Sequence, residues 1–188
     1  MSKWNLSGAG FSREQIVTDG NRFLCANGYM GLRGVVEEAD SSCFPAITLA
    51  GVYDQYQDRW REPVNAPHCL YVQLTFDGKP LTAEKAAQHR AGVDYGDGFY
   101  FRETDFGPVV LQSQRFVSMA ETHLLCDRIE LKFAEAGEVE LLTGISTDIW
   151  DINGPHLFDF RFQQGGRCWP RLSPDRRASR WLQPSARM

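Results

Sequence analysis

The length, composition and charge of the chain indicate a globular protein and exclude several classes. Its 188 residues suffice for one domain of ordinary size, and 43% hydrophobic residues can build a buried core. The formal net charge is −4, whereas a nucleic-acid-binding domain normally carries a clustered basic face. We therefore exclude a nucleic-acid partner and expect a folded chain.

Neither a secretion signal nor a membrane span is visible. Residues 1–10 contain no apolar core, and no stretch reaches the roughly 18 apolar residues of a membrane helix. The five cysteines are scattered, without a C-x-x-C pair or zinc-ligand spacing among them or the four histidines. We expect reduced thiols, no metal site, no membrane contact and a soluble, cytoplasmic protein.

Charge is distributed unevenly along the chain. Residues 165–188 hold six arginines and one acidic residue, a net +5, so the total of −4 leaves residues 1–164 at −9. The same segment contains three prolines and shows neither a period of 2 nor one of 3.6. We predict a domain over residues 1–164 and a disordered or non-native tail over 165–188. A frameshifted end is favoured over a functional basic arm because the composition changes abruptly.

Short strands dominate the pattern before that tail. Residues 70–76 alternate and stop at the turn pair Asp77-Gly78, which predicts a strand with one buried face. Only residues 82–89 have helical character. The predicted inward side chains of the first strand are Leu70, Val72, Leu74 and Phe76. Further short strands are predicted at residues 98–103, 109–112 and 114–117.

The alternation returns at residues 125–133, which predicts another strand with one buried face. Residues 134–137 can turn the chain, so we predict that residues 138–142 form the second arm of a hairpin. Several strands at close spacing, separated by Gly and Asp turns, predict an all-β fold, an antiparallel β-sandwich. The predicted inward side chains of this strand are Ile129, Leu131 and Phe133.

Glycine recurs at every third residue within residues 27–34. The order G-x-x-G-x-x-G differs from phosphate-binding loops and no helical pattern follows it, so we exclude a nucleotide site. We interpret the segment as structural: its glycines adopt positive φ or admit neighbouring backbone, and its arginine clamps a nearby carboxylate, including that of Glu62 as one option. The residues of this motif are Asn27, Gly28, Gly31, Arg33, Gly34, Glu37 and Glu38.

A second cluster combines an indole, charged groups and an amide in a proline-bounded loop at residues 59–68. Sugar sites use such loops, because an indole covers the C–H face of a pyranose while polar groups bond its hydroxyls. An exposed loop or a domain contact explains the composition equally well. The candidates for contact with a sugar are Trp60, Arg61, Glu62 and Asn65.

A third cluster occupies residues 147–156 and adds Asp151 and His156 to the candidates near a sugar. The aspartates Asp148 and Asp151 are not assigned as a general acid and base, because that assignment depends on their separation in space. No G-x-S-x-G, H-E-x-x-H or cysteine nucleophile signature occurs. We therefore predict no catalytic residue in this chain.

These clusters, in this order, resemble the N-terminal domain of glycoside hydrolase family 65. Order and spacing over residues 14–157 make the resemblance specific, although each motif alone is weak. The matching stretches are residues 22–34 with Glu37 and Glu38, then 49–54, 61–67, 76–78, 114–118 and 148–156.

The resemblance implies a supersandwich fold of the galactose-mutarotase-like type, followed in the family by a helical linker, an (α/α)6 barrel and a small sheet domain. Most members are inverting phosphorylases of α-linked glucose disaccharides such as maltose, trehalose, kojibiose or nigerose. They use inorganic phosphate as co-substrate, need no cofactor and release β-glucose 1-phosphate. A barrel glutamate protonates the leaving oxygen while phosphate attacks the opposite face.

Neither that glutamate nor the phosphate site has a counterpart in residues 1–188, so the resemblance implies a chain that is not catalytic alone. We expect a poorly stable fragment of the sandwich, incomplete on its C-terminal side, with the barrel as its partner. A homodimer would fit the family. Two alternatives stay open. One is a freestanding carbohydrate-binding module with Trp60 or Trp150 as stacking platform; the other is a non-functional product of a broken gene.

Overall fold

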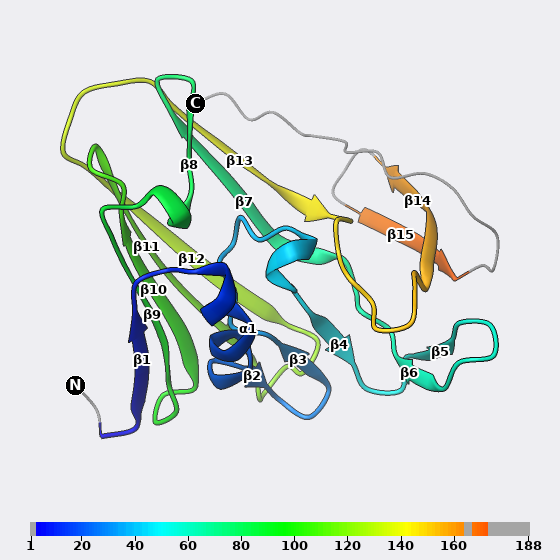
Figure 1. Cartoon of the computed structure of the whole chain (residues 1–188). Helices are drawn as coiled ribbons and strands as arrows, with labels where there is room; N and C mark the ends of the chain where they lie inside the picture. The colour runs from blue at the N-terminus through cyan, green and yellow to red at the C-terminus, as the bar shows by residue number, and fades with distance from the viewer. Residues whose placement is uncertain (1–2, 164–166, 173–188) are drawn as a thin grey trace.

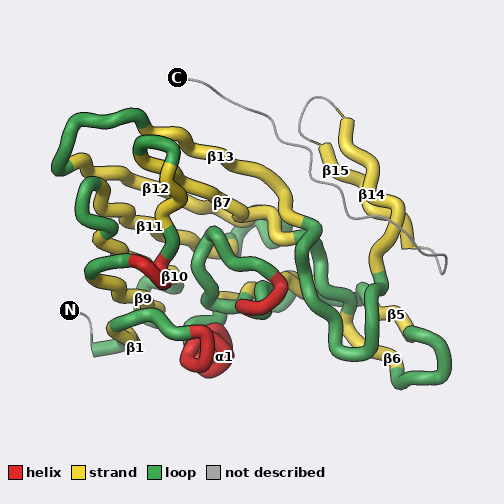
Figure 2. The backbone as a smooth tube through the Cα atoms, turned by 45° about the horizontal axis from the view of Figure 1, so that its top comes forward, coloured by secondary structure: helices red, strands yellow, loops and turns green. Residues whose placement is uncertain are grey.

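The computed structural model describes residues 3–163 and 167–172 and has an all-β architecture built from antiparallel sheets. Two larger sheets cross obliquely and pack face to face, as a β-sandwich does (Figure 1). The smaller hairpins β5–β6 and β14–β15 lie at the opposite end of the molecule from β1 and β9 in both ribbon views (Figure 2). The predicted all-β sandwich is therefore confirmed.

The larger sheet has five strands in the order β1-β9-β10-β11-β12, every pair antiparallel. The segments predicted at 109–112 and 114–117 form one uninterrupted strand, because side chains alternate without a break from Val109 to Val117. The strands are β1 Asn5–Ala9, β9 Gln88–Asp94, β10 Phe99–Asp105, β11 Val109–Val117 and β12 Leu125–Phe133.

The second sheet has the order β13-β7-β8, with β7 at His68–Phe76, β8 at Lys79–Leu81 and β13 at Val139–Ser146. The predicted alternation of β7 is confirmed, since Val72, Leu74 and Phe76 are buried. The turn between β7 and β8 places Asp77 and Gly78 at φ 47° and 71°, a conformation that Asp tolerates and Gly favours.

The remaining elements are short and connect the two sheets. The strands are β2 Cys25–Ala26, β3 Met30–Leu32, β4 Ile47–Leu49, β5 Tyr53–Gln55, β6 Arg61–Pro63, β14 Leu157–Gln163 and β15 Arg167–Leu172. The helices are α1 Arg13–Arg22 and the 3-10 turns η1 Ser41–Cys43 and η2 Ala83–Lys85.

The predicted hairpin of residues 125–142 is wrong. Strand β12 pairs with β11, whereas β13 pairs with β7 in the other sheet, with Val139 opposite Phe76. Residues 134–138 thus carry the chain from one sheet to the other, and the backbone of Glu138 donates to and accepts from Asp77 at 2.8 Å. The side chain of Phe133, predicted to face inward, is 56% exposed at this crossing point.

The helical prediction also needs correction. Residues 82–89 form only η2 before entering β9, whereas an unpredicted helix, α1, begins after Ser12. The Ser12 hydroxyl accepts a hydrogen bond from the Gln15 amide at 3.1 Å, which satisfies one of the free N–H groups of the first turn.

The sandwich core lies between β7 and β13 of one sheet and β11 and β12 of the other. Its buried members are Leu74, Phe76, Val109 and Leu111, with Ile129, Leu131, Val139 and Leu141 packed around them. A second cluster joins β2, β3 and β4 to the five-stranded sheet through residues such as Phe23, Leu32, Ile47 and Tyr100.

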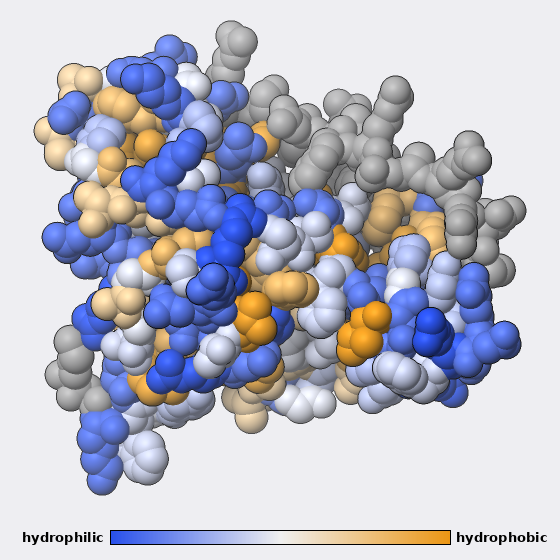
Figure 3. Space-filling model, in the orientation of Figure 1, coloured by the Kyte–Doolittle hydropathy of each residue, from blue (hydrophilic) through white to orange (hydrophobic). Residues whose placement is uncertain are grey.

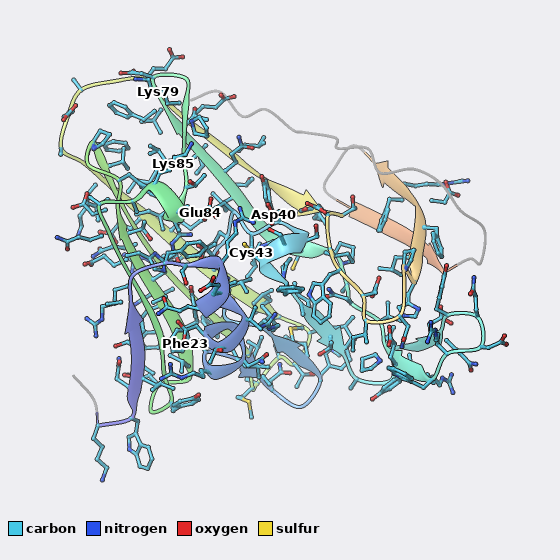
Figure 4. All side chains as sticks on the ribbon, viewed as in Figure 1. Phe23, Asp40, Cys43, Lys79, Glu84 and Lys85 are labelled. Atoms are coloured by element: carbon cyan, nitrogen blue, oxygen red, sulfur yellow. The ribbon has the colours of Figure 1, made fainter. Side chains whose placement is uncertain are left out.

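A polar contact fastens α1 to both 3-10 turns at the surface. The Arg13 guanidinium at the start of α1 contacts the Glu84 carboxylate of η2 and lies 3.6 Å from the carboxylate of Asp40, the N-cap of η1. Figure 4 labels Asp40 and Glu84, which come from these two different turns. One arginine thus joins three segments that are far apart in the sequence.

The boundary predicted at residue 164 falls between β14 and β15, which pair with each other. Strand β15 therefore lies in the range assigned to the tail, while residues 173–188 lie outside the described residues. The interpretation of residues 165–188 as a non-native end stays a prediction.

Candidate functional site

Two clusters of polar side chains connect distant segments of the described structure. The first, the ionic cluster, consists of Glu37, Glu38, Arg102, Ser113 and Arg115. The strands β10 and β11 supply its two arginines and its serine from the inner face of the five-stranded sheet. The loop after β3 supplies the two glutamates.

Arg102 forms the centre of the ionic cluster. Its guanidinium donates to Glu37 at 2.6 Å and to both carboxylate oxygens of Glu38 at 2.5 and 2.9 Å, while Nε donates to Thr104 at 2.7 Å. The Arg102 side chain has no exposed surface and that of Glu37 has 1%. Buried charges need such complete pairing, because desolvating an unpaired charge is very costly.

The charge state of Glu37 follows from its partners. Burial alone would raise the pKa of Glu37, but Arg102, Arg115 and the Ser113 hydroxyl outweigh it and hold that pKa at about 2. Burial likewise opposes the charge of Arg102, yet Glu38 and Glu37 raise its pKa. Glu37 and Arg102 are therefore both ionised near neutral pH, so Glu37 holds no proton to donate there.

Two neutral histidines border the ionic cluster. His68 contacts the Glu37 carbonyl at 3.1 Å, and His89 contacts the Thr104 hydroxyl at 2.9 Å. Burial and the nearby Arg115 lower the pKa of His68 to about 4, and burial with Arg102 does the same for His89. Both rings are consequently uncharged above that pH.

The proposed role of Arg33 as a carboxylate clamp is wrong. Its guanidinium donates to the carbonyls of Phe44 at 2.8 Å and Val17 at 2.6 Å, and no carboxylate pairs with it among the described residues. Gly20 makes room for it, since a Cβ there would stand 2.8 Å from Arg33 Nη2. Arg102, 64 residues from Glu38, takes the clamping role instead.

The expected structural roles are found for Asn27, Gly28 and Gly34, whereas Gly31 has neither a positive φ nor close neighbouring backbone. Gly28 has φ +84°, and a Cβ at Gly34 would lie 2.4 Å from Cβ of Phe23. Gly31 lies within β3, where a Cβ would meet Thr48 Oγ1 at 3.4 Å. Asn27 caps the turn by accepting from two backbone amides at 2.9 and 3.0 Å and donates to the carbonyl of Ser118 at 2.7 Å.

The second cluster, the hairpin latch, consists of Asp54, Glu62, Asn153 and His156. His156 lies between two carboxylates, with Nε2 at 2.7 Å from Glu62 and Nδ1 at 3.3 Å from Asp54. Glu62 also accepts from the Asn153 amide at 3.0 Å. The latch fastens the β5–β6 hairpin to the loop before β14, and it brings together two of the residues proposed to lie near a sugar.

Two further candidates of that group serve the same loop. Asn65 donates to the Trp150 carbonyl at 2.8 Å and to the Pro45 carbonyl at 2.9 Å, and accepts from the Ile47 amide at 3.0 Å. Asp151 accepts from the His156 amide at 3.3 Å. The amide of Asn65 is therefore occupied by backbone, and its geometry is that of a buried brace.

The candidates Trp60 and Arg61 lie on the open side of the hairpin. Trp60 is 62% exposed, and Arg61 is also exposed. Trp150, the other proposed stacking platform, instead packs edge-on against Phe44 with ring centroids 5.3 Å apart. Figure 3 shows one face of the molecule, mainly hydrophilic with separate hydrophobic spots.

Metal ligands and a proton donor are the catalytic groups to look for among the described residues. They contain no group of three or more His, Cys, Asp or Glu arranged to hold a metal ion. Burial, followed by Glu37, raises the pKa of Asp127 to about 6, which is the range of a general acid. Asp127, however, lines neither the hollow on the five-stranded sheet beside Phe101 nor the one beside η2 in the described part of the chain. No helix in that part is long and apolar enough to cross a membrane.

The fold and the two clusters define a β-sandwich domain that is stabilised by buried ion pairs. Its β5–β6 hairpin exposes aromatic side chains. The sequence profile described as "Glycosyl hydrolase family 65, N-terminal domain" matches residues 6–178, so the chain belongs to this family as its N-terminal domain.

Relatives and solved structures agree with this assignment. A nigerose phosphorylase from Lachnoclostridium phytofermentans is 38% identical over 167 residues, which cover 86% of this chain and 22% of the relative. A 1,2-alpha-glucosylglycerol phosphorylase from Bacillus selenitireducens is 26% identical over 82% of this chain and 21% of its own length. A putative kojibiose phosphorylase from the human microbiome has the same fold, with a TM-score of 0.71 at 12% identity over 86% of this chain and 24% of its own. The chain thus spans about a fifth of the length of its curated relatives.

Proposed function

We propose that this chain serves as the N-terminal domain of an inverting disaccharide phosphorylase and supports a catalytic barrel without supplying a reacting group. The parent reaction cleaves an α-linked glucose disaccharide with inorganic phosphate and gives β-glucose 1-phosphate and a sugar. The observation that carries the proposal is the 38% identity to a nigerose phosphorylase over 86% of the chain.

The chemistry of the buried carboxylates supports the absence of a reacting group. An inverting phosphorylase needs a carboxylic acid that holds a proton near the leaving oxygen. Glu37 is ionised between two arginines, and Glu62 is held by His156, which together with Asn153 lowers the pKa of that carboxyl although burial opposes the shift. Neither side chain is available to protonate a substrate.

The β5–β6 hairpin is the part of the domain that we assign to the approach of the sugar site. Its inner side carries Asp54 and Glu62 in the latch, while its outer side exposes Tyr53 and Arg61, with Trp60 beside them. Aromatic rings and arginine are the residue types that contribute most at protein interfaces. In the assembled enzyme this surface contacts the barrel near its substrate loops.

A fusion protein tests the proposal. The chain replaces the matching segment of the Lachnoclostridium phytofermentans nigerose phosphorylase, and formation of glucose 1-phosphate is measured with nigerose, kojibiose, maltose and trehalose. We expect the fusion to form glucose 1-phosphate and the chain alone to form none. Activity of the chain alone would overturn the supporting role.

The matched control is the same phosphorylase without any N-terminal segment. If the domain supports the barrel, this control loses soluble activity that the fusion retains. Equal activity of the fusion and the control would show that the chain contributes nothing to the enzyme.

A freestanding carbohydrate-binding module remains the second candidate, and the 62% exposure of Trp60 is the observation in its favour. Saturable binding of a glucose disaccharide to the chain alone, abolished by Trp60→Ala, would favour it over the supporting role.

A further inference from the structure

The outer face of the five-stranded sheet is hollowed on the side opposite the ionic cluster. The hollow has a volume of about 390 Å³, which falls within the roughly 300–1,000 Å³ typical of small-molecule sites. It is distinct from the β5–β6 hairpin, none of whose residues line it.

Strand register gathers the lining side chains into two rows. Phe101 of β10 lies opposite Gln114 of β11, which lies opposite Arg128 of β12. In the adjacent row, Glu103 lies opposite Gln112, and Glu103 also lies opposite Arg90 of β9. Because side chains two residues apart share a face of a sheet, all six project from the outer face.

Aromatic surface forms one wall of the hollow. The rings of Phe99 and Phe101 lie with centroids 6.5 Å apart, and the Arg90 guanidinium carbon stands 5.5 Å from the Phe101 centroid. The Phe101 ring extends over Gly92, where a Cβ would approach it to 2.8 Å. Gly92 therefore lets the ring lie low on the sheet, with the Arg90 guanidinium over part of its outer face.

The polar groups around this wall match a neutral, hydroxyl-rich ligand. Gln112 and Gln114 offer amides, which both donate and accept hydrogen bonds. The charges balance, since Arg90 and Arg128 are matched by Glu103 and Glu130. A phosphate or another anion would meet the two carboxylates, whereas a sugar hydroxyl can bond to every one of these groups.

The existing contacts of these side chains are weak enough to rearrange. Arg128 pairs with Glu130 at 2.9 Å while their side chains are 75% and 47% exposed, and Gln112 donates to Glu103 at the surface. Exposed pairs of this kind contribute little stability. A ligand that offers hydroxyl groups can therefore replace them without disturbing the fold.

We propose that the outer-face hollow is a carbohydrate-binding site for a neutral oligosaccharide of glucose, separate from the reacting centre. The C–H face of one pyranose stacks on Phe101, and its hydroxyls bond to Gln112, Gln114 and Glu103. The choice of a glucose oligosaccharide follows from the proposed function, whereas the location and neutrality of the ligand follow from the hollow itself.

Isothermal titration of the 188-residue chain with maltotriose and nigerose tests this site. We expect saturable binding at millimolar sugar, and weakening on the order of tenfold or more in Phe101→Ala and in Gln112→Ala, because each removes one contact type. Circular dichroism and thermal unfolding verify that the variants are folded; Gln112→Ala alters a surface side chain and is the safer of the two. Met119→Ala changes an exposed side chain that does not line the hollow, so it is the matched control and keeps full binding.

The outcomes separate this proposal from the function of the domain. Loss of binding in Trp60→Ala with unchanged binding in Gln112→Ala would move the site to the hairpin and overturn the proposal. Absence of sugar binding to the folded chain, or binding of inorganic phosphate in its place, would also overturn it. Neither result bears on whether the fusion phosphorylase is active, so the two proposals fail independently.

Discussion

Arg102 binds two carboxylates and a hydroxyl in the interior of the described structure. It joins the glutamates of the loop after β3 to the inner face of the five-stranded sheet and has no exposed side-chain surface. Arg128 lies on the outer face of the same sheet. It forms an ion pair that is open to solvent, and 75% of its side chain is exposed. The two arginines therefore differ in burial while sharing one sheet.

Replacing each arginine with methionine measures this difference. We expect Arg102→Met to lower the free energy of unfolding by about 3–5 kcal/mol, because Glu37 is left as a buried charge without its main partner. Arg128→Met removes an exposed pair and costs at most about 1 kcal/mol. Urea unfolding monitored by circular dichroism gives both values. Similar losses in the two variants would contradict the assigned role of Arg102.

Gly34 is a second residue that the surrounding structure constrains, because a side chain there would clash with Phe23. A Cβ there would stand 2.4 Å from Cβ and 2.5 Å from the carbonyl oxygen of Phe23, whereas a Cβ at Gly144 meets nothing within 4 Å. We expect Gly34→Ala to destabilise the chain by about 1–3 kcal/mol or more through overpacking. Gly144→Ala, the matched control, is expected to be close to neutral. Thermal unfolding compares them, and a neutral Gly34→Ala would show that the backbone of Phe23 yields easily.

Sequence reasoning found the glutamates of the ionic cluster but not the arginine that binds them. It assigned the clamp to Arg33 because a planar guanidinium fits a carboxylate, whereas the arginine that binds Glu37 is Arg102, 65 positions away. A signal was present: in β10 the inward positions run Tyr100, Arg102, Thr104, so an arginine falls on the buried face of an alternating strand. Such an arginine requires a buried acidic partner, but the alternation within one strand does not predict which residue that partner is.

Individual strands were predictable and their partners were not. Alternation identified β7 and β12, because the period of an alternating strand can be read locally, whereas β11 was predicted as two separate short strands. The pairing of β13 with β7 joins residues that are more than 60 positions apart in the sequence. The connection between β12 and β13 is short, so the sequence alone favoured a hairpin of these two strands. Helix α1 was missed although Ser12 and Gln15 have the spacing of a capping box.

The hairpin latch gives the β5–β6 element its position, and His156 is its centre. Burial lowers the pKa of His156, but Glu62, Asp151 and Asp54 outweigh burial and raise it above the ordinary value of 6.5. A raised pKa in the folded state means that the protonated latch stabilises the hairpin below pH 6.5 and loses this contribution as the pH rises through the folded-state pKa.

Hydrogen exchange of the amides of residues 53–63 tests the latch. We expect His156→Ala to reduce their protection strongly, because the buried Glu62 loses its ring partner and keeps only Asn153. Protection in the wild-type chain, corrected for the intrinsic rate, is expected to decline above pH 6.5. Arg59→Ala, at the exposed tip, is the control and leaves protection unchanged. Equal protection in His156→Ala and the wild type would refute the latch.

At the scale of the whole molecule, the two neutral histidines make the domain sensitive to acid. The folded-state pKa of His68 and His89 is about 4, against an ordinary 6.5. Between pH 6.5 and 4 the unfolded chain therefore binds protons that the folded chain does not. The free energy of unfolding consequently decreases as the pH is lowered through this window. Glu37, with a pKa of about 2, extends the loss below pH 4.5, while the raised pKa of Asp127, about 6, opposes it between pH 6 and 3.8.

Urea unfolding at pH 7, 5.5 and 4.5 measures this response. Each histidine is expected to remove up to about 3 kcal/mol of stability over the full window. In the double variant His68→Asn, His89→Gln the decline between pH 6.5 and 4 becomes shallower. A variant that loses stability as steeply as the wild type would place the acid response elsewhere.

The central claim is that the domain supports phosphorolysis through its folded structure and supplies no reacting group. The most direct test compares Arg102→Met and Arg128→Met in the fusion phosphorylase, measuring kcat at low temperature and the temperature at which activity is lost. We predict that Arg102→Met lowers the inactivation temperature by several degrees while kcat at low temperature stays unchanged, and that Arg128→Met alters neither. A large fall in kcat at low temperature, with the inactivation temperature unchanged, would contradict the account.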